Sequence, residues 1–268
     1  MKSGYVTITG SKIYYEITGS GGPIIFIHAD TLDTRQWQSQ VERFSSKYQA
    51  ITYDIRGMGK SDLPAQGAYS FSEDLYQLME KLNIQSAHLV GLSLGAAIAI
   101  DFTLTHQDKV LTLTLADAGI SGDGFEEEFL SEIGKVVTFA KHMQLNETRK
   151  SWADLHIFDY SRSNPEVWDN VTKMVQDTSC YRWYGDNQPI NISPVAVERL
   201  SELKIPTLIM VGEYDIPDFQ RKAQLLHEKI VNNKLVVIPS AGHLSNLDNP
   251  EFFNTQLASF LKEYDQAQ

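Results

Sequence analysis

Gly91-Leu92-Ser93-Leu94-Gly95 is the stretch of the chain that decides the fold. It directly follows an apolar run at 87–90, and it opens a run of small residues at 96–99 that is typical of a closely packed helix. A serine on such a tight strand-to-helix turn sits in strained backbone, which glycines on both sides accommodate. The turn lifts the hydroxyl clear of the sheet, and the helix N-terminus behind it favours negative charge. The pattern therefore predicts that Ser93 is a nucleophile.

Short apolar segments alternate with amphipathic ones around this motif. An N-terminal hairpin is expected at 6–17, and a capping box, Ser70 to Glu73, opens one of the helices. Alternation of buried strands and helices predicts right-handed crossovers and an α/β fold with a doubly wound, mostly parallel sheet. Strands are expected at 24–27, 50–53, 87–90 and 110–115, and helices at about 37–44, 71–82 and 94–105.

The alternation stops between residues 121 and 200, where no buried-strand run occurs. Strand-helix order then resumes with strands at 205–211 and 234–238, a helix at 219–230 and a last helix from about Asn249. We therefore expect one α/β core, residues 1–120 and 201–268, interrupted by a helical cap at 121–200. No targeting segment and no apolar run of 18 residues is evident, so a cytoplasmic location is expected.

A serine nucleophile needs a base, and the base needs a carboxylate to orient it. Of the seven histidines, His243 follows a strand at its C-terminal end, where α/β sheets place their sites, so we expect it to be the base. Asp215 lies at the same sheet edge and is the expected acid. Asp117 is the competing acid, and Glu213 is a weaker one. His28, His88, His106 and His227 are interpreted as structural or exposed.

The order Ser, Asp, His along the chain belongs to one fold in particular. Together with Asp54-Ile55-Arg56-Gly57-Met58-Gly59-Lys60-Ser61, which matches a D-x-R-G-x-G-x-S turn, it gives a chain that resembles the α/β-hydrolase fold superfamily over nearly its whole length. The N-terminal half, with His28-Ala29 followed by Asp33-Thr34-Arg35-Gln36-Trp37, is similar to that of small bacterial carboxylesterases and enol-lactonases. In that family the D-x-R-G-x-G-x-S turn is a loop scaffold, so Asp54 and Arg56 are expected to be structural.

The resemblance also implies an oxyanion hole. Its two donors would be the backbone N–H groups of Leu94 and Asp30, with Ala29 in place of the family's usual glycine. Because a carboxylate would repel a developing oxyanion, we expect the Asp30 side chain to point away. In the insertion, Trp152, Trp183 and His142 are candidates for the substrate pocket, and His156 is a further histidine that could line it.

The resemblance implies a serine hydrolase that cleaves a carboxylic ester or lactone of a small to medium apolar substrate through an acyl-enzyme on Ser93. Two alternatives remain open: a C–C bond hydrolase with the same triad, and a slow-turnover sensing or regulatory protein. A serine nucleophile argues against the dehalogenase and epoxide-hydrolase branches. The residues leave the acyl-chain length and the oligomeric state open.

Composition narrows the partners. The 268 residues carry a formal net charge of −11 without a basic run, so binding to nucleic acid or to an anionic membrane is not expected. The single cysteine, Cys180, excludes an intrachain disulfide framework and a cysteine zinc cluster. No ligand cluster or dinucleotide motif occurs, so no metal or other cofactor is expected. The expected partner is a small-molecule substrate.

Overall fold

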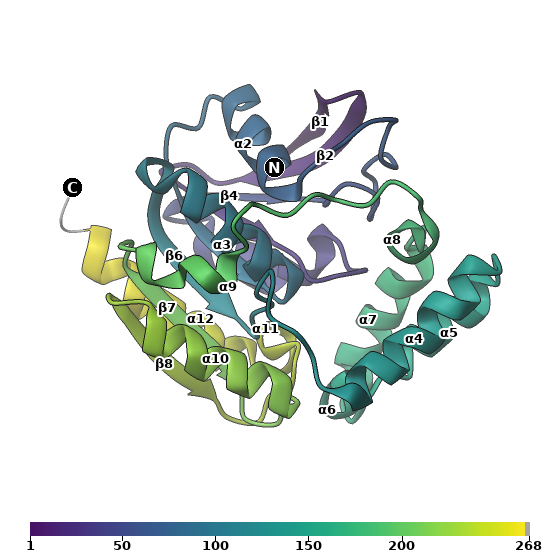
Figure 1. Ribbon diagram of the computed structural model, residues 1–268. Helices are drawn as coiled ribbons and strands as arrows, with labels where there is room; N and C mark the ends of the chain where they lie inside the picture. The colour runs from purple at the N-terminus through teal and green to yellow at the C-terminus, as the bar shows by residue number, and fades with distance from the viewer. Residues whose placement is uncertain (266–268) are drawn as a thin grey trace.

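An eight-stranded sheet forms the centre of the computed structural model, which describes residues 1–265 (Figure 1). Strand β2 runs antiparallel to both of its neighbours, β1 and β4, and the remaining neighbouring strands are parallel. The predicted α/β fold with a mostly parallel sheet is thereby confirmed. The spatial order is β1-β2-β4-β3-β5-β6-β7-β8, and the strands are β1 (Lys2–Ile8), β2 (Ser11–Thr18), β3 (Gly22–Ile27), β4 (Tyr48–Tyr53), β5 (Ala87–Leu92), β6 (Val110–Ala116), β7 (Thr207–Gly212) and β8 (Asn233–Ile238).

Helices cover both faces of the sheet, as a doubly wound fold requires. Along β3, Ile25 and Ile27 pack with the helices of one face, whereas Ile24 and Phe26 pack with those of the other. All four side chains are fully buried, which explains why the strand reads as a continuous apolar run rather than an alternating one. The first face carries α2 (Phe71–Lys81), α3 (Leu94–Thr105) and α10 (Pro217–Lys229), and the second carries α1 (Gln38–Phe44) and α12 (Pro250–Asp265).

The segment between β6 and β7 contains only helices and loops, and most of its helices stand off to one side of the sheet (Figure 1). They are α4 (Glu127–Lys141), α5 (Leu145–Ala153), α6 (Asp159–Arg162), α7 (Pro165–Asp177) and α8 (Tyr181–Tyr184). Helix α9 (Ala196–Arg199) instead packs in the same core as α3, with Ala196 fully buried. The division into core and cap at residues 121 and 200 stays a prediction, and residues 266–268 of that core lie outside the described residues.

Five short elements complete the chain. They are the 3₁₀ turns η1 (Thr34–Trp37), η2 (Gln107–Lys109), η3 (His156–Phe158) and η4 (Leu200–Glu202), and the short helix α11 (Ser245–Asp248). Among the described residues, no helix has both the length and the apolar character needed to cross a lipid bilayer.

Helix α2 begins where the sequence predicts, but its predicted capping box does not form. Ser70 occupies the N-cap position without a capping hydrogen bond from its side chain. Its hydroxyl lies 2.9 Å from that of Ser72, and the Glu73 carboxylate instead accepts from Gln77 one turn further on. Ser70 and Glu73 are therefore each bonded to another side chain instead of making the reciprocal backbone hydrogen bonds of a capping box.

The turn at residues 54–61 is a scaffold, in agreement with the expectation for Asp54 and Arg56. Asp54 accepts hydrogen bonds from the backbone N–H groups of Thr34 and Lys60, at 2.8 and 2.7 Å. Arg56 is fully buried and donates to both carboxylate oxygens of Asp74 on α2 and to the carbonyl of Ile8 on β1. The turn therefore fastens α2 to the N-terminal hairpin.

Candidate active site

Ser93 lies on the sharp turn between β5 and α3, with φ 56° and ψ −113°. A non-glycine residue in such a conformation costs of the order of 1–3 kcal/mol and persists only where its surroundings impose it. The flanking glycines are required for space. A Cβ on Gly91 would lie 2.3 Å from the carbonyl oxygen of Gly95, and one on Gly95 would lie 2.1 Å from that of Ile27. The turn therefore depends on close backbone approach at both glycines.

Gly95→Ala is expected to destabilise the protein by about 1–3 kcal/mol or more, because the new methyl group meets backbone that cannot rotate away. Gly134→Ala is the matched control, since that glycine lies within α4 and faces open space. There alanine should stabilise by up to about 1 kcal/mol through helix propensity. Urea unfolding of both variants tests this, and equal midpoints would contradict it.

His243 and Asp215 meet at the carboxyl end of the sheet, because they follow the neighbouring strands β8 and β7. His243 Nδ1 lies 3.0 Å from Asp215 Oδ2, and the other oxygen of Asp215 accepts from the N–H of Ile216 at 2.8 Å. Both side chains are buried. When Nδ1–H donates to the carboxylate, Nε2 is the nitrogen that can accept a proton.

The competing acids have other hydrogen-bond partners. Asp117 is fully buried at the end of β6 and accepts hydrogen bonds from the N–H of Gly212 and from the hydroxyl of Ser245. Glu213 is exposed and accepts from the N–H of Ser240. Among the three candidates it is Asp215 that carries the hydrogen bond to His243.

Burial is the largest cause of the pKa shifts of His243, Asp215 and Asp117. It lowers the pKa of His243 from its usual 6.5 to about 4, and the charges of Asp117 and Asp248 oppose that shift. Burial also raises the pKa of Asp215 and that of Asp117 well above the ordinary range. The imidazole is therefore held neutral, which is the form that can accept a proton.

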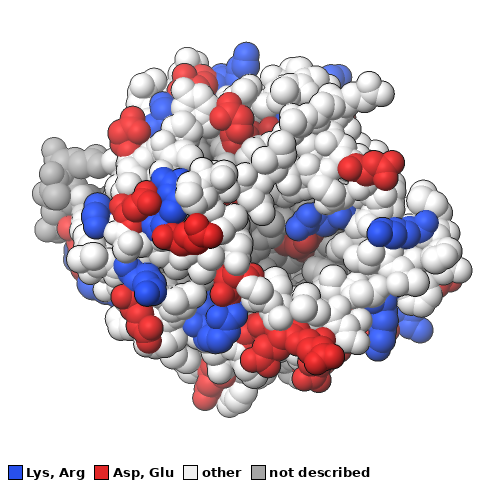
Figure 2. Space-filling view, in the orientation of Figure 1, with Lys and Arg blue, Asp and Glu red and all other residues white. Residues whose placement is uncertain are grey.

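Ser93 and His243 line one cavity of about 800 Å³, together with Leu94 and Asp30. The Ser93 hydroxyl forms no hydrogen bond with any of residues 1–265. The backbone N–H groups of Leu94 and Asp30 likewise have no acceptor within the described part of the chain. The cavity therefore holds a free hydroxyl, a buried imidazole and two free N–H donors. Figure 2 shows the surface hollowed on this face, with basic and acidic side chains beside the hollow.

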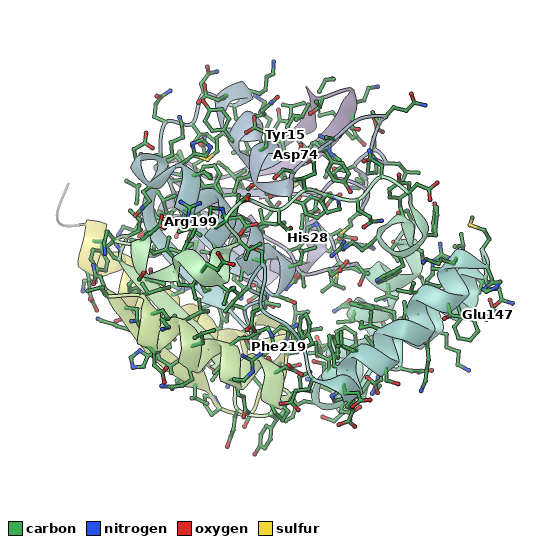
Figure 3. The ribbon with its side chains drawn as sticks, in the orientation of Figure 1. Tyr15, His28, Asp74, Glu147, Arg199 and Phe219 are labelled. Carbon is green, nitrogen blue, oxygen red and sulfur yellow. The ribbon has the colours of Figure 1, made fainter. Side chains whose placement is uncertain are left out.

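His28 directly follows β3 and has a structural role, as its position predicts. Its Nδ1 bonds to the carbonyl of Ala29 at 2.7 Å, and its Nε2 accepts from the N–H of Ile55 at 2.9 Å. Both ring nitrogens are thus occupied. In Figure 3, His28 lies near the centre, Phe219 lies at the start of α10, and Glu147 lies far from both on α5.

The comparisons with known proteins identify the family. The model of the alpha/beta hydrolase fold matches residues 22–250. The chain belongs to the alpha/beta hydrolase fold family.

Relatives in this family carry several activities. The chain is 27% identical to 3-oxoadipate enol-lactonase 1 of Acinetobacter baylyi, over 94% of both chains. It superposes on Est816, described as an N-acyl homoserine lactone degrading enzyme, with a TM-score of 0.75 and 28% identity, covering 96% of this chain and 100% of that one. A thermophilic esterase from Thermogutta terrifontis shares the fold, with a TM-score of 0.80 at 23% identity over 98% and 99% of the two chains.

Within this alpha/beta hydrolase, the segment at 121–200 supplies most of the apolar cavity wall. Trp152 and Trp183 line the cavity as expected, with ring centroids 4.8 Å apart. Sequence reasoning missed Ile133 and Val137 of α4, although their four-residue spacing on an amphipathic helix was a usable signal.

Neither histidine of the insertion lines the cavity, so the placement of His142 in the pocket is corrected. His142 is exposed just beyond the end of α4, where its ring bonds to the carbonyl of Thr138 at 2.8 Å. It therefore caps a helix. His156 pairs with Glu132 at 2.6 Å and also lies outside the lining.

The Asp30 carboxylate is balanced by a cation from the insertion. Arg182 on α8 approaches its Oδ2 to 3.4 Å, and both residues line the cavity. Oδ1 of Asp30 is buried without a hydrogen-bond partner among the described residues, and burial raises the pKa of this carboxyl. The charge beside the two N–H donors is therefore reduced by Arg182.

Helix α6 contacts the two loops that carry Asp215 and His243. The ring of Tyr160 stacks on that of Tyr214, with centroids 5.0 Å apart and planes within 5°. Ser161 donates to Asp248 Oδ2 at 3.0 Å, and the same oxygen accepts from the N–H of Gly242 at 2.9 Å. The insertion thus supports both loops directly.

Residues 1–265 contain no group of three or more His, Cys, Asp or Glu side chains arranged to hold a metal ion.

Proposed function

We propose that the protein is a serine hydrolase that works through an acyl-enzyme on Ser93. His243 Nε2 takes the proton from Ser93, and Ser93 Oγ attacks the carbonyl carbon of the substrate. Asp215 holds the imidazole in the required tautomer and stabilises its charged form. The Leu94 and Asp30 N–H groups bind the oxyanion, and the C–O bond to the alcohol then breaks as His243 gives its proton to the leaving oxygen. Water activated by His243 attacks the acyl-enzyme and releases the acid and free Ser93. The observation that carries this proposal is the bond from Asp215 to His243, because His243 lines the same cavity as the strained Ser93.

The proposed substrate is a carboxylic ester or lactone with a small to medium apolar group. The apolar wall supports this, since it includes Phe129, Ile133, Val137, Trp152, Phe158 and Trp183. An enol-lactonase and an enzyme that degrades N-acyl homoserine lactones are among the relatives, which supports the lactone as well as the linear ester.

A fluorophosphonate probe and a series of p-nitrophenyl esters of rising acyl length test the proposal, beside a matched lactone and its linear ester. We expect the probe to label Ser93 and at least one ester or lactone to be turned over. Labelling without ester turnover would favour the C–C hydrolase or the sensing protein. A chain that takes no label and turns over nothing contradicts the proposal.

Val137→Trp should shift the preferred acyl length downward. Val137 lines the cavity from α4, and an indole there removes space for the longer chains while leaving Ser93 untouched. We expect kcat/KM to fall about 10-fold or more for the longest ester used, and to change little for acetate. Thr138→Trp, at an exposed position of the same helix, is the control and should leave the whole series unchanged. A uniform loss across the series would contradict the placement of the acyl group.

The pH dependence of kcat/KM should extend unusually far into the acid range. A base works only when neutral, and the lowered pKa of His243 keeps it neutral below the ordinary 6.5. We expect kcat/KM to remain flat from pH 8 to below pH 6, and to fall about tenfold per pH unit only once the pH passes the lowered pKa. An acid limb centred at or above pH 6.5 would contradict this, once stability over the range has been checked.

A further inference from the structure

We propose that Asp117 is a positioning residue of this site that shares one proton with Asp215, so that the two carboxyl groups together present a single negative charge to His243. The inference rests on the proposed function only in treating His243 as a base oriented by Asp215.

The backbone brings Asp117 to the centre of the group. Strands β6 and β7 are parallel neighbours, and the N–H of Asp117 donates to the carbonyl of Met210 at 2.9 Å. Asp117 has φ 44°, a left-handed conformation in a fully buried aspartate. Such strain persists only when the surroundings impose it. It bends the chain at the end of β6.

The Asp117 side chain joins the two loops that carry the other groups. Its Oδ1 accepts from Gly212, the last residue of β7, three positions before Asp215. Its Oδ2 accepts from the hydroxyl of Ser245, two positions after His243. One carboxyl group thereby ties the acid loop to the histidine loop.

The Asp117 and Asp215 carboxyl groups also act on each other: a hydrogen bond from Asp117 lowers the pKa of Asp215, and the charge of Asp215 raises the pKa of Asp117. The side chain of Asp215 has no exposed surface, and Asp117 has none either. Two interacting carboxyl groups without exposed surface cannot both stay ionised, so one proton is retained between them. An O–H to O⁻ hydrogen bond is the arrangement that satisfies both groups.

The surrounding charges favour retention of that proton. The charged groups that act most strongly on the pair are His243, Asp218 and Asp248. Asp218 and Asp248 are acidic and raise the cost of a second negative charge. His243 is the only one of the three that can become positive, and burial keeps it neutral at rest.

Asp117→Asn tests whether the proton is shared, because the acid limb of kcat/KM moves to higher pH if it is and to lower pH if both carboxyl groups are ionised. If the proton is shared, the pair carries one negative charge in the wild-type protein. With asparagine at position 117, that whole charge lies on Asp215 beside His243. The imidazolium is then better stabilised, and the acid limb of kcat/KM should move up by about 0.5 to 1 pH unit. If both carboxyls were ionised, the variant would lose a negative charge near His243 and the limb would move down. A purely structural Asp117 would lower kcat without moving the limb, and either of these two results overturns the proposal.

Asp101→Asn is the matched control. Asp101 is another buried carboxyl, in α3, and it accepts a hydrogen bond from the hydroxyl of Ser121. It lies outside the lining of the cavity, so its substitution should leave the acid limb in place. A shift equal to that of Asp117→Asn would show that the effect is general and would also overturn the proposal.

Infrared spectroscopy of the full-length protein with ¹³C-labelled aspartate tests the shared proton without relying on turnover. At pH 7 we expect the wild-type spectrum to contain a protonated-carboxyl band that is lost in Asp117→Asn. If that variant does not fold by circular dichroism, Asp215→Asn serves in its place and should lose the same band. Its persistence in the folded variant overturns the proposal. A wild-type protein that shows the band but hydrolyses nothing would contradict the proposed function and leave the shared proton standing.

Discussion

Ser93→Ala is expected to abolish turnover, with kcat reduced by about 10⁶-fold, because the attacking oxygen is lost and the remaining groups cannot form an acyl-enzyme. The fold should survive, since the Ser93 hydroxyl has no hydrogen-bond partner within residues 1–265. The variant should therefore unfold in urea at nearly the wild-type midpoint. Turnover of the best chromogenic ester and labelling by a fluorophosphonate are the two measurements, and both should fall to background.

Ser240→Ala is the matched control for that experiment. Ser240 also has a left-handed backbone, with φ 52°, but it is exposed and lies outside the cavity lining. It should keep full turnover and full labelling. If Ser93→Ala retained covalent label or more than a trace of turnover, the nucleophile would have to be another residue.

Arg56→Met is expected to destabilise the protein by about 3–5 kcal/mol, because it leaves the Asp74 carboxylate buried without a partner. That is a large share of the roughly 5–15 kcal/mol that holds a typical domain folded. The loss should appear as a lower urea midpoint. Activity per folded molecule should remain, since the turn at 54–61 positions α2 and the hairpin and supplies no cavity wall.

Two further variants define the origin of that loss. Lys173→Ala breaks an exposed ion pair with Asp169 on α7 and should cost no more than about 0.5 kcal/mol. Arg56→Met combined with Asp74→Leu removes both charges and should recover much of the stability. If the double variant were as unstable as Arg56→Met alone, the lost packing of the arginine stem would be the cause rather than the unpaired charge.

The fold was predictable because its signals are local. The run from Ile24 to Ile27 is continuously apolar because both faces of this strand are covered, so it predicts a buried strand. Residues 91–95 predict the turn because close backbone contacts require glycine at both ends. Asp215 and His243 could be proposed for a similar reason. Each follows a strand immediately, and parallel neighbouring strands end at one edge.

Other features of the site depend on contacts between distant segments, which no local pattern reports. The pairing of Asp30 with Arg182 spans 152 residues, and the meeting of Asp117 with Ser245 spans 128. His142 was misplaced because a histidine in an insertion has no spacing that separates a pocket wall from a helix end. The capping box failed for a similar reason, since Glu73 had a competing partner on its own helix.

Helix α6 has a consequence for protein engineering. Tyr160 stacks on Tyr214 in the loop that carries Asp215, and Ser161 bonds to Asp248, which in turn accepts from Gly242 beside His243. The insertion therefore stabilises these two loops as well as lining the cavity. Exchanging this segment for that of a relative would change the lining of the cavity and the positions of Asp215 and His243 together. A chimera made to alter selectivity should therefore retain an aromatic ring at position 160 and a hydroxyl group at position 161.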